Sequence, residues 1–192
     1  SIAEAHGLAW RSDEDLLTEV SHLVEFPISI ECSFDARYLE IPDAVLVSEM
    51  KGHQKYLALA DEHGNLSNRF VAVSNMRCDS EELVRKGYQN VLKSRFADAE
   101  FFLREDMKIT LESRVAKLAE SVFQAKLGSI LDKVERFRSL AGYIGGCLKL
   151  DDATLATVDT VARLCKADLT TAMVGEFPEL QGEIGSYYAG LQ

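Results

Sequence analysis

Hydrophobic and polar residues alternate with two different periods in the first part of the chain. Behind the acidic run 13–15, apolar residues recur at helical spacing at Leu16, Leu17, Val20, Leu23 and Val24. This pattern predicts a short amphipathic helix. Residues 26–34 then alternate apolar and polar, as a half-buried strand does, with Pro27 near the strand start. Residues 43–51, preceded by Pro42, form a second short segment with helical spacing.

Two more segments with strand character flank a turn. Residues 55–60 and 69–74 are rich in apolar residues, and the segment 61–65 between them is polar and contains Gly64. This arrangement predicts a β-hairpin with Gly64 as the turn glycine. We therefore expect three antiparallel strands, all of them before residue 76.

Beyond Asp79 every hydrophobic pattern is helical. Apolar residues recur at helical spacing in four series, within 84–96, 111–123, 131–144 and 155–165. We expect the second series to break or kink at Gly128 and the third to stop at Gly145-Gly146, because glycine is common just past a helix end. The fourth is expected to begin at Asp151 and to run through to Phe177-Pro178.

These patterns predict an α+β fold that is mainly α. A small three-stranded antiparallel sheet with helices is expected in residues 1–78, followed by an all-helical region in residues 79–192 that is truncated at its C-terminus. The chain begins without Met and ends at Gln192 without an obvious terminating structure. We expect it to be an excised piece of a longer protein.

Composition excludes a disordered or membrane-spanning chain. Hydrophobic residues make up 47% of the 192 residues, which is enough for a real core. The chain has no uninterrupted apolar run of about 18 residues, and its N-terminus lacks a signal-peptide pattern. A cytoplasmic location is therefore expected. The four cysteines are widely spaced with no C-x-x-C pair, which favours reduced thiols over a disulfide framework or a zinc site.

The formal net charge of −10 argues against a freestanding nucleic-acid binder. A local basic strip remains compatible with that charge. Two short segments supply one, and the candidate RNA-binding residues are Lys51, His53, Lys55, Lys93 and Arg95. Next to Tyr56, such residues can hold phosphates and stack on a base or ribose. The alternative is ordinary solvated surface charge, with Tyr56 packed on the sheet.

Motifs for nucleotide binding and nucleophilic catalysis are missing from the sequence. The glycine cluster 142–149 follows a helix, and Lys149 is succeeded by Leu150 where a phosphate-binding loop needs Ser or Thr. The chain contains no Gly-x-Ser-x-Gly elbow, and none of its cysteines has a histidine beside it in the sequence. We expect no catalytic centre in this chain.

A metal centre is also not expected. The four histidines are His6, His22, His53 and His63, so the second half of the chain has no imidazole. Three aspartates, Asp132, Asp159 and Asp168, remain as possible ligands, and one carboxylate per helix is a weak ligand set for Mg²⁺. We expect Asp168 to be structural, capping a helix or pairing with Arg163 or Lys166.

Six segments, taken in order, carry a family resemblance. They are Val24-Glu-Phe-Pro27, Met50-Lys-Gly-His-Gln-Lys-Tyr56, Phe70-Val-Ala-Val-Ser-Asn75, Arg95-Phe-Ala-Asp-Ala-Glu-Phe-Phe102, Phe123-Gln124 with Lys126-Leu-Gly-Ser129, and Lys166-Ala-Asp-Leu through Glu176-Phe-Pro-Glu-Leu-Gln-Gly182. Together they resemble the beta subunit of the bacterial two-subunit glycyl-tRNA synthetase. The resemblance covers most of the chain, from about residue 19 to residue 189.

The resemblance implies a division of labour between two subunits. The alpha subunit would hold the adenylate-forming site for glycine and for ATP with Mg²⁺, while the beta subunit binds and orients tRNA(Gly). The helical region of that family resembles an HD-type phosphohydrolase fold, whose metal-binding His-Asp pair is replaced here by Ala167-Asp168. Lys51, Lys55 and Arg95 match basic positions of the family motifs. The segment 88–90 departs from the family pattern, which leaves the role of that polar triplet open.

Two functions follow as alternatives. The first is a non-catalytic part of glycine–tRNA ligase that contributes to tRNA binding and positioning. The second is a structural module that holds the alpha and beta parts together without direct RNA contact. In both, the expected partners are the alpha subunit or alpha region and tRNA(Gly), the parent enzyme is a hetero-oligomer, and no cofactor is bound by this chain itself.

Overall fold

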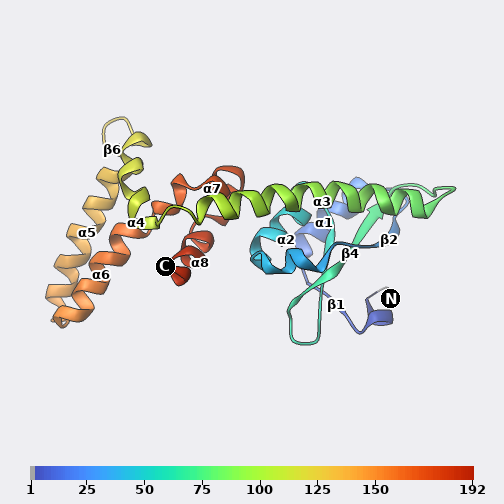
Figure 1. The fold of residues 1–192 in the computed structure, drawn as a ribbon, viewed down its shortest axis with the longest axis horizontal. Helices are drawn as coiled ribbons and strands as arrows, with labels where there is room; N and C mark the ends of the chain where they lie inside the picture. Colours follow the sequence, from blue (N-terminus) through green and yellow to red (C-terminus); the bar gives the residue numbers. More distant parts are fainter. Residues whose placement is uncertain (1–2) are drawn as a thin grey trace. The chain divides into compact units, whose positions relative to one another are not determined.

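The computed structural model describes residues 3–192. The chain divides into two compact units, Ser1–Phe101 and Phe102–Gln192, and each is described here by itself. Strands and helices, including most of the long helix α3 (Glu81–Asp106), make up the first unit, and helices make up most of the second (Figure 1). The predicted class, an α+β fold that is mainly α, is confirmed.

The first unit contains an antiparallel sheet of four strands in the order β1-β3-β4-β2. The strands are β1 (Ala9–Trp10), β2 (Ile28–Ser33), β3 (Leu57–Ala60) and β4 (Leu66–Ser74). The predicted hairpin is confirmed as β3 and β4. In its turn the Asp61 carboxylate accepts the backbone N–H of His63 and of Asn65, each at 2.9 Å. Gly64 has a φ of +85°, which glycine adopts without steric cost.

The prediction of only three strands is wrong. A fourth strand, β1, pairs Ala9 with Ala60 and Trp10 with Leu59 along the edge of β3. Two residues are too few to show a hydrophobic period, so the sequence pattern could not reveal this strand. It exists because the open edge of β3 offers hydrogen-bonding groups to the chain that passes beside it.

Among its described residues, the first unit contains three α-helices, one of them only in part, and two 3₁₀ turns. They are η1 (Glu4–His6), α1 (Glu14–Leu23), η2 (Ala36–Glu40), α2 (Asp43–Gly52) and the first part of α3 (Glu81–Asp106). The Asp13 side chain caps α1 by accepting the N–H of Leu16 at 2.9 Å. The helices predicted at 13–24 and 43–51 are therefore confirmed.

Aromatic side chains fill the core between α3 and the sheet. The fully buried ring of Phe96 lies 4.9 Å from Phe34 and 5.5 Å from Tyr38, measured between ring centroids. The ring of Tyr56 lies 4.8 Å from that of Phe70 and 5.7 Å from that of Tyr88. Because α3 supplies Phe96 and Tyr88, its first part belongs to the same core as the strands.

This packing explains where the units divide. The sequence predicted a change between residues 78 and 79, where strand patterns give way to helical ones. The compact units divide further along, within α3, between Phe101 and Phe102. The change from strand to helical hydrophobic spacing marks where the strands end. The first unit extends further, because the first part of α3 packs on its core.

The second unit contains six α-helices, one of them shared, and three 3₁₀ turns among its described residues. After the end of α3 come α4 (Leu111–Arg114), η3 (Val115–Glu120), α5 (Ile130–Cys147), α6 (Asp152–Leu164), η4 (Ala167–Thr170), α7 (Ala172–Glu176), η5 (Pro178–Leu180) and α8 (Glu183–Leu191). The helices α5 and α6 lie side by side as a hairpin (Figure 1). The predicted single helix from Asp151 to Phe177 is therefore broken into α6 and shorter segments.

The prediction that the second half is all-helical is wrong at one place. A two-stranded hairpin, β5 (Val122–Gln124) and β6 (Gly128–Ser129), stands where the helical series 111–123 was expected to continue. Gly128 has a φ of +85°, and Ser129 caps α5 in a capping box with Asp132. The turn glycine and the cap together favour a hairpin over a longer helix.

The helix α5 ends at Cys147, one residue beyond the expected stop at Gly145-Gly146. A Cβ atom on Gly145 would lie 2.5 Å from the Leu155 side chain, so the glycine permits the close approach of α5 and α6. The left-handed residue after the helix is Lys149, with a φ of 54°. The glycine therefore serves packing rather than helix termination.

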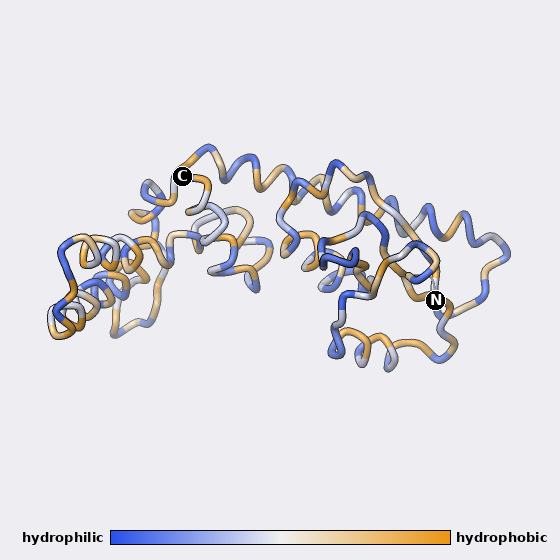
Figure 2. Tube along the Cα trace, turned by 90° about the horizontal axis from the view of Figure 1, so that it is seen from below, coloured by the Kyte–Doolittle hydropathy of each residue, from blue (hydrophilic) through white to orange (hydrophobic). Residues whose placement is uncertain are grey.

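No helix among the described residues is long and apolar enough to cross a membrane. Hydrophilic residues interrupt the hydrophobic ones throughout the trace (Figure 2).

Candidate nucleic-acid interface

Three of the predicted RNA-binding residues lie together at the junction between α2 and β3. Lys51 is in the last turn of α2, His53 caps its C-terminus, and Lys55 follows two residues later. Lys55 has a φ of 56°, a left-handed conformation that is uncommon for a residue with a Cβ. This turn lets the Tyr56 N–H reach the Met50 carbonyl at 2.9 Å, so the loop is short and tightly closed.

Both lysines of this junction form ion pairs with α1. The Lys51 ammonium lies 2.6 Å from the Asp13 carboxylate, and the Lys55 ammonium lies 2.8 Å from the Glu19 carboxylate. The hydrogen bond from Lys51 holds the pKa of Asp13 below its ordinary value, and the Leu16 N–H adds to the effect. The sequence gave no sign of these pairs, because their members are more than thirty residues apart.

The aromatic residue of the junction is not available for stacking on a base. Tyr56 is only 4% exposed and packs against Phe70 and Tyr88. Burial raises the pKa of its phenol above the ordinary value. The predicted alternative, in which Tyr56 packs on the sheet, is therefore confirmed. His53 is exposed beside it.

Lys93 and Arg95 lie on a different element, α3, and leave that helix on different sides. They are two positions apart in α3, so their side chains leave the helix about 200° apart. Lys93 is exposed, whereas Arg95 is half-buried and precedes the core residue Phe96. The two residues therefore belong to different sides of α3. Their role in RNA binding stays a prediction.

Each aspartate considered as a metal ligand has a structural contact. Asp132 accepts the backbone N–H of Ser129 at 2.7 Å within the capping box. Asp159 forms a two-pronged pair with Arg138, both contacts at 2.9 Å. In residues 3–192 no cluster of three or more His, Cys, Asp or Glu side chains is placed to hold a metal ion.

The third aspartate, Asp168, is buried in η4 and contacts the residue before α8. Its Oδ2 atom accepts the Gly182 N–H at 2.5 Å. The expected pairing with Arg163 is wrong, because Arg163 forms an ion pair with Glu112. The carboxylate instead holds the backbone of Gly182, the residue before α8, which is a structural contact.

The cysteines are all free thiols. Cys32 is buried in β2, and burial raises the pKa of its thiol to about 11. Cys78 is half-buried, and Cys147 and Cys165 are exposed.

A buried charge network in the second unit was not predicted. The Asp106 carboxylate at the end of α3 accepts a hydrogen bond from Arg114 at 2.9 Å and the backbone N–H groups of Ala172 and Met173, each at 2.9 Å. It also accepts the Tyr188 hydroxyl at 3.2 Å. Burial raises the pKa of that phenol above its ordinary value, and the adjacent carboxylate adds to the effect. Asp106 therefore caps α7 and joins four segments of the unit.

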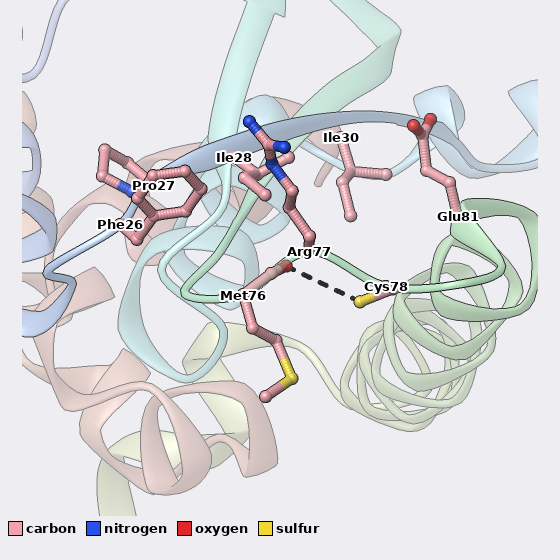
Figure 3. A pocket seen from close by; sticks show the side chains of 8 residues that line it. All are labelled: Phe26, Pro27, Ile28, Ile30, Met76, Arg77, Cys78 and Glu81. Carbon is pink, nitrogen blue, oxygen red and sulfur yellow. Dashed lines mark hydrogen bonds between the residues drawn. The ribbon is translucent and has the colours of Figure 1, made fainter.

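A pocket on the first unit was also missed by the sequence prediction. It has a volume of about 440 Å³ and lies beside β2, with Phe26 and Met76 on its wall (Figure 3). Phe26 is 52% exposed and Met76 is 65% exposed. The Arg77 guanidinium carbon lies 5.5 Å from the centre of the Phe26 ring, and Cys78 also lines the pocket.

Two of the family segments meet at this pocket. The side-chain oxygen of Asn75 accepts the backbone N–H of Glu25 at 2.8 Å and that of Phe26 at 2.9 Å. Asn75 thereby fixes the segment that precedes β2 against the end of β4. Segments 24–27 and 70–75 are both among those that carry the family resemblance. Their presence in the sequence was the signal that could have pointed to this pocket.

Comparisons with known proteins agree with these segments. A family model described as the glycyl-tRNA synthetase beta subunit matches residues 1–192. A glycine–tRNA ligase beta subunit from Neisseria meningitidis is 47% identical over 180 residues, covering 94% of this chain and 26% of the relative. The Myxococcus xanthus protein of the same name is 48% identical over 190 residues, covering 98% of this chain and 27% of the relative.

The similarity therefore extends over nearly the whole chain. These relatives are subunits of an aminoacyl-tRNA synthetase by their names. The chain belongs to the glycyl-tRNA synthetase beta-subunit family. It spans about a quarter of the length of the curated relatives that it matches.

Proposed function

We propose that this chain is a non-catalytic part of a glycine–tRNA ligase that helps to bind and position tRNA(Gly). Adenylate formation from glycine and ATP with Mg²⁺ belongs to the alpha subunit or alpha region, with which the parent chain forms a hetero-oligomer in the cytoplasm. Family membership supports the assignment to the ligase. The observation that carries the RNA-binding role is the group Lys51, His53 and Lys55 at the junction between α2 and β3.

The ion pairs of the loop are compatible with this role. The side chains of Lys51 and Lys55 are 42% and 34% exposed, so their pairs with α1 are in contact with water. Exposed pairs contribute about 0–1 kcal/mol, which is little enough for an RNA phosphate to replace the carboxylate. With a net charge of −10 on the chain, RNA contact of this kind is local rather than spread over the surface.

Replacing Lys51 and Lys55 together with alanine in the full enzyme is expected to weaken tRNA(Gly) binding at moderate salt. Each phosphate contact contributes roughly 0.7–0.9 to the slope of log affinity against log salt, so the double variant should reduce that slope by about 1.4–1.8. Glycine-dependent adenylate formation should continue. Filter binding at several salt concentrations and a pyrophosphate-exchange assay measure the two effects.

The carboxylate partners provide a matched control. Asp13→Asn and Glu19→Gln remove the negative charges of the same ion pairs but leave both lysines in place, and asparagine keeps an oxygen that can cap α1. If the lysines contact RNA, these changes keep or raise the affinity. If the lysines only hold α1, the lysine double variant and the two carboxylate variants all lower stability and tRNA binding is unchanged, which would contradict the RNA-binding proposal.

The second candidate function is docking of the alpha part, and the exposed pocket at Phe26 and Met76 favours it. Replacing both residues with serine is expected to reduce recovery of the alpha subunit when it is co-purified through the beta subunit, because large exposed apolar side chains are typical of protein interfaces. Leu83→Ser, which alters another exposed residue of the same unit, is the control. Unchanged recovery would exclude this pocket as the docking site.

A further inference from the structure

A second pocket lies wholly within the second unit and has no part in the proposed function. It has a volume of about 580 Å³ and is lined by α6, η4 and α8. Most of its wall is apolar, from Leu111, Val161, Leu164 and Ala189. One carboxylate, that of Asp168, belongs to the same lining.

The Asp168 side chain is seated against the first turn of α8. The residue is 1% exposed, and its Oδ2 atom accepts the Gly182 N–H at 2.5 Å. A Cβ atom on Gly185 would lie 2.9 Å from the same oxygen, so the glycine makes room for the carboxylate. The other oxygen, Oδ1, has no hydrogen-bond partner among residues 3–192.

An unpaired oxygen on a buried carboxylate is costly. Buried polar atoms are almost always hydrogen-bonded, and a buried charge is normally paired with an opposite charge. Arg163, the basic residue of α6, is already paired with Glu112. The site therefore favours a bound group that brings both a hydrogen-bond donor and a positive charge.

The surroundings decide which cation fits. Mg²⁺ and Ca²⁺ require several oxygen ligands, and no cluster of three such side chains exists in residues 3–192. The apolar wall instead matches an alkyl chain, which loses little by leaving water. An organic cation satisfies the wall and the carboxylate together.

We propose that this pocket binds an aliphatic cation, with the alkyl chain along Val161 and Leu164 and the ammonium or guanidinium group at Asp168. The cation comes either from a free alkylamine or from a lysine or arginine side chain of a protein segment. Both sources present the same chemistry to the pocket.

Four probes test the proposal on the 192-residue chain by titration followed with NMR chemical shifts. They are n-butylammonium, n-butylguanidinium, n-butanol and Nα-acetyl-lysine methylamide. Because a hydrogen bond to a charged group is stronger than a neutral one, n-butylammonium should bind at least about tenfold more tightly than n-butanol. If Nα-acetyl-lysine methylamide binds about as tightly as n-butylammonium, the source of the cation is a protein side chain. If it binds more weakly than n-butylammonium, the source is a free amine.

Two variants locate the binding. In Asp168→Asn the side-chain oxygen still accepts the Gly182 N–H, while the charge is gone, so the preference for n-butylammonium over n-butanol should disappear. Asp152→Asn, at an exposed position of α6, is the matched control and should keep the preference. Equal binding of the charged and neutral probes to the unaltered chain would overturn the proposal, as would a preference that survives in Asp168→Asn.

A third variant covers the case in which Asp168→Asn does not fold. Val161 is 61% exposed at the pocket, so Val161→Trp fills space there without a change in the buried core. The Val161→Trp variant is expected to lose n-butylammonium binding. In the unaltered chain, n-butylammonium should slow the chemical modification of Cys165, because this exposed thiol lines the same pocket. Unchanged n-butylammonium binding in Val161→Trp would exclude this pocket.

Discussion

Replacing Asp106 with alanine is expected to lower the free energy of unfolding of the second unit by about 3–5 kcal/mol. The change leaves the Arg114 guanidinium, whose side chain is 5% exposed, without its counterion. It also removes the acceptor for the first N–H groups of α7, at Ala172 and Met173, and for the Tyr188 hydroxyl. Loss of a buried partner is costly because each remaining group keeps the full desolvation penalty.

Urea unfolding measures this loss, and hydrogen exchange at Ala172 and Met173 locates it at α7. Asp159→Ala is the matched control, because it breaks the ion pair with Arg138 at an exposed site, where the Asp159 side chain is 49% exposed. That control should change stability by no more than about 1 kcal/mol. A similar small loss for Asp106→Ala would show that the network does not hold the unit together.

Replacing Phe96 with alanine is expected to destabilise the first unit by about 3–5 kcal/mol. The ring is fully buried, with its centroid 4.9 Å from that of Phe34 and 5.5 Å from that of Tyr38. Its removal leaves a cavity between α3 and the sheet that rigid neighbours fill only in part. The first part of α3 should loosen before the β3–β4 hairpin does, because that hairpin keeps its own backbone hydrogen bonds.

Thermal unfolding and exchange of α3 amides measure the effect. Leu83→Ala serves as the control on the same helix, because Leu83 is 71% exposed. An exposed substitution of this kind changes stability by about 0.5 kcal/mol or less. Equal effects of Phe96→Ala and Leu83→Ala would contradict the view that α3 is part of the first core.

Local signals predicted much of the fold. The helix at α1 depends on Asp13 and the apolar residues that follow it, and the β3–β4 turn depends on Asp61 and Gly64. Both need only neighbours in the sequence, so the pattern contains them. The predictions failed where a distant segment decides the outcome. The strand β1 pairs with the edge of β3, and the Leu155 side chain leaves no room for a Cβ atom at Gly145.

The RNA-binding role of the candidate residues stays a prediction, and the sequence did not show how their side chains are arranged. The sequence placed Lys51, His53 and Lys55 close together, because they are neighbours in the chain. It could not show that Asp13 and Glu19 already hold the two lysines, since ion pairs across the fold depend on how α1 packs.

By itself, the sequence determined the family, the mainly helical class and the lack of any imidazole after residue 63. These depend on residue identity and on short-range periodicity. Only the tertiary structure decided that Asp106 is a buried cap for α7 and that Asp168 keeps one oxygen unpaired beside an apolar pocket. The energy of a carboxylate depends on whether water or protein surrounds it, and burial is a property of the packed chain rather than of any segment.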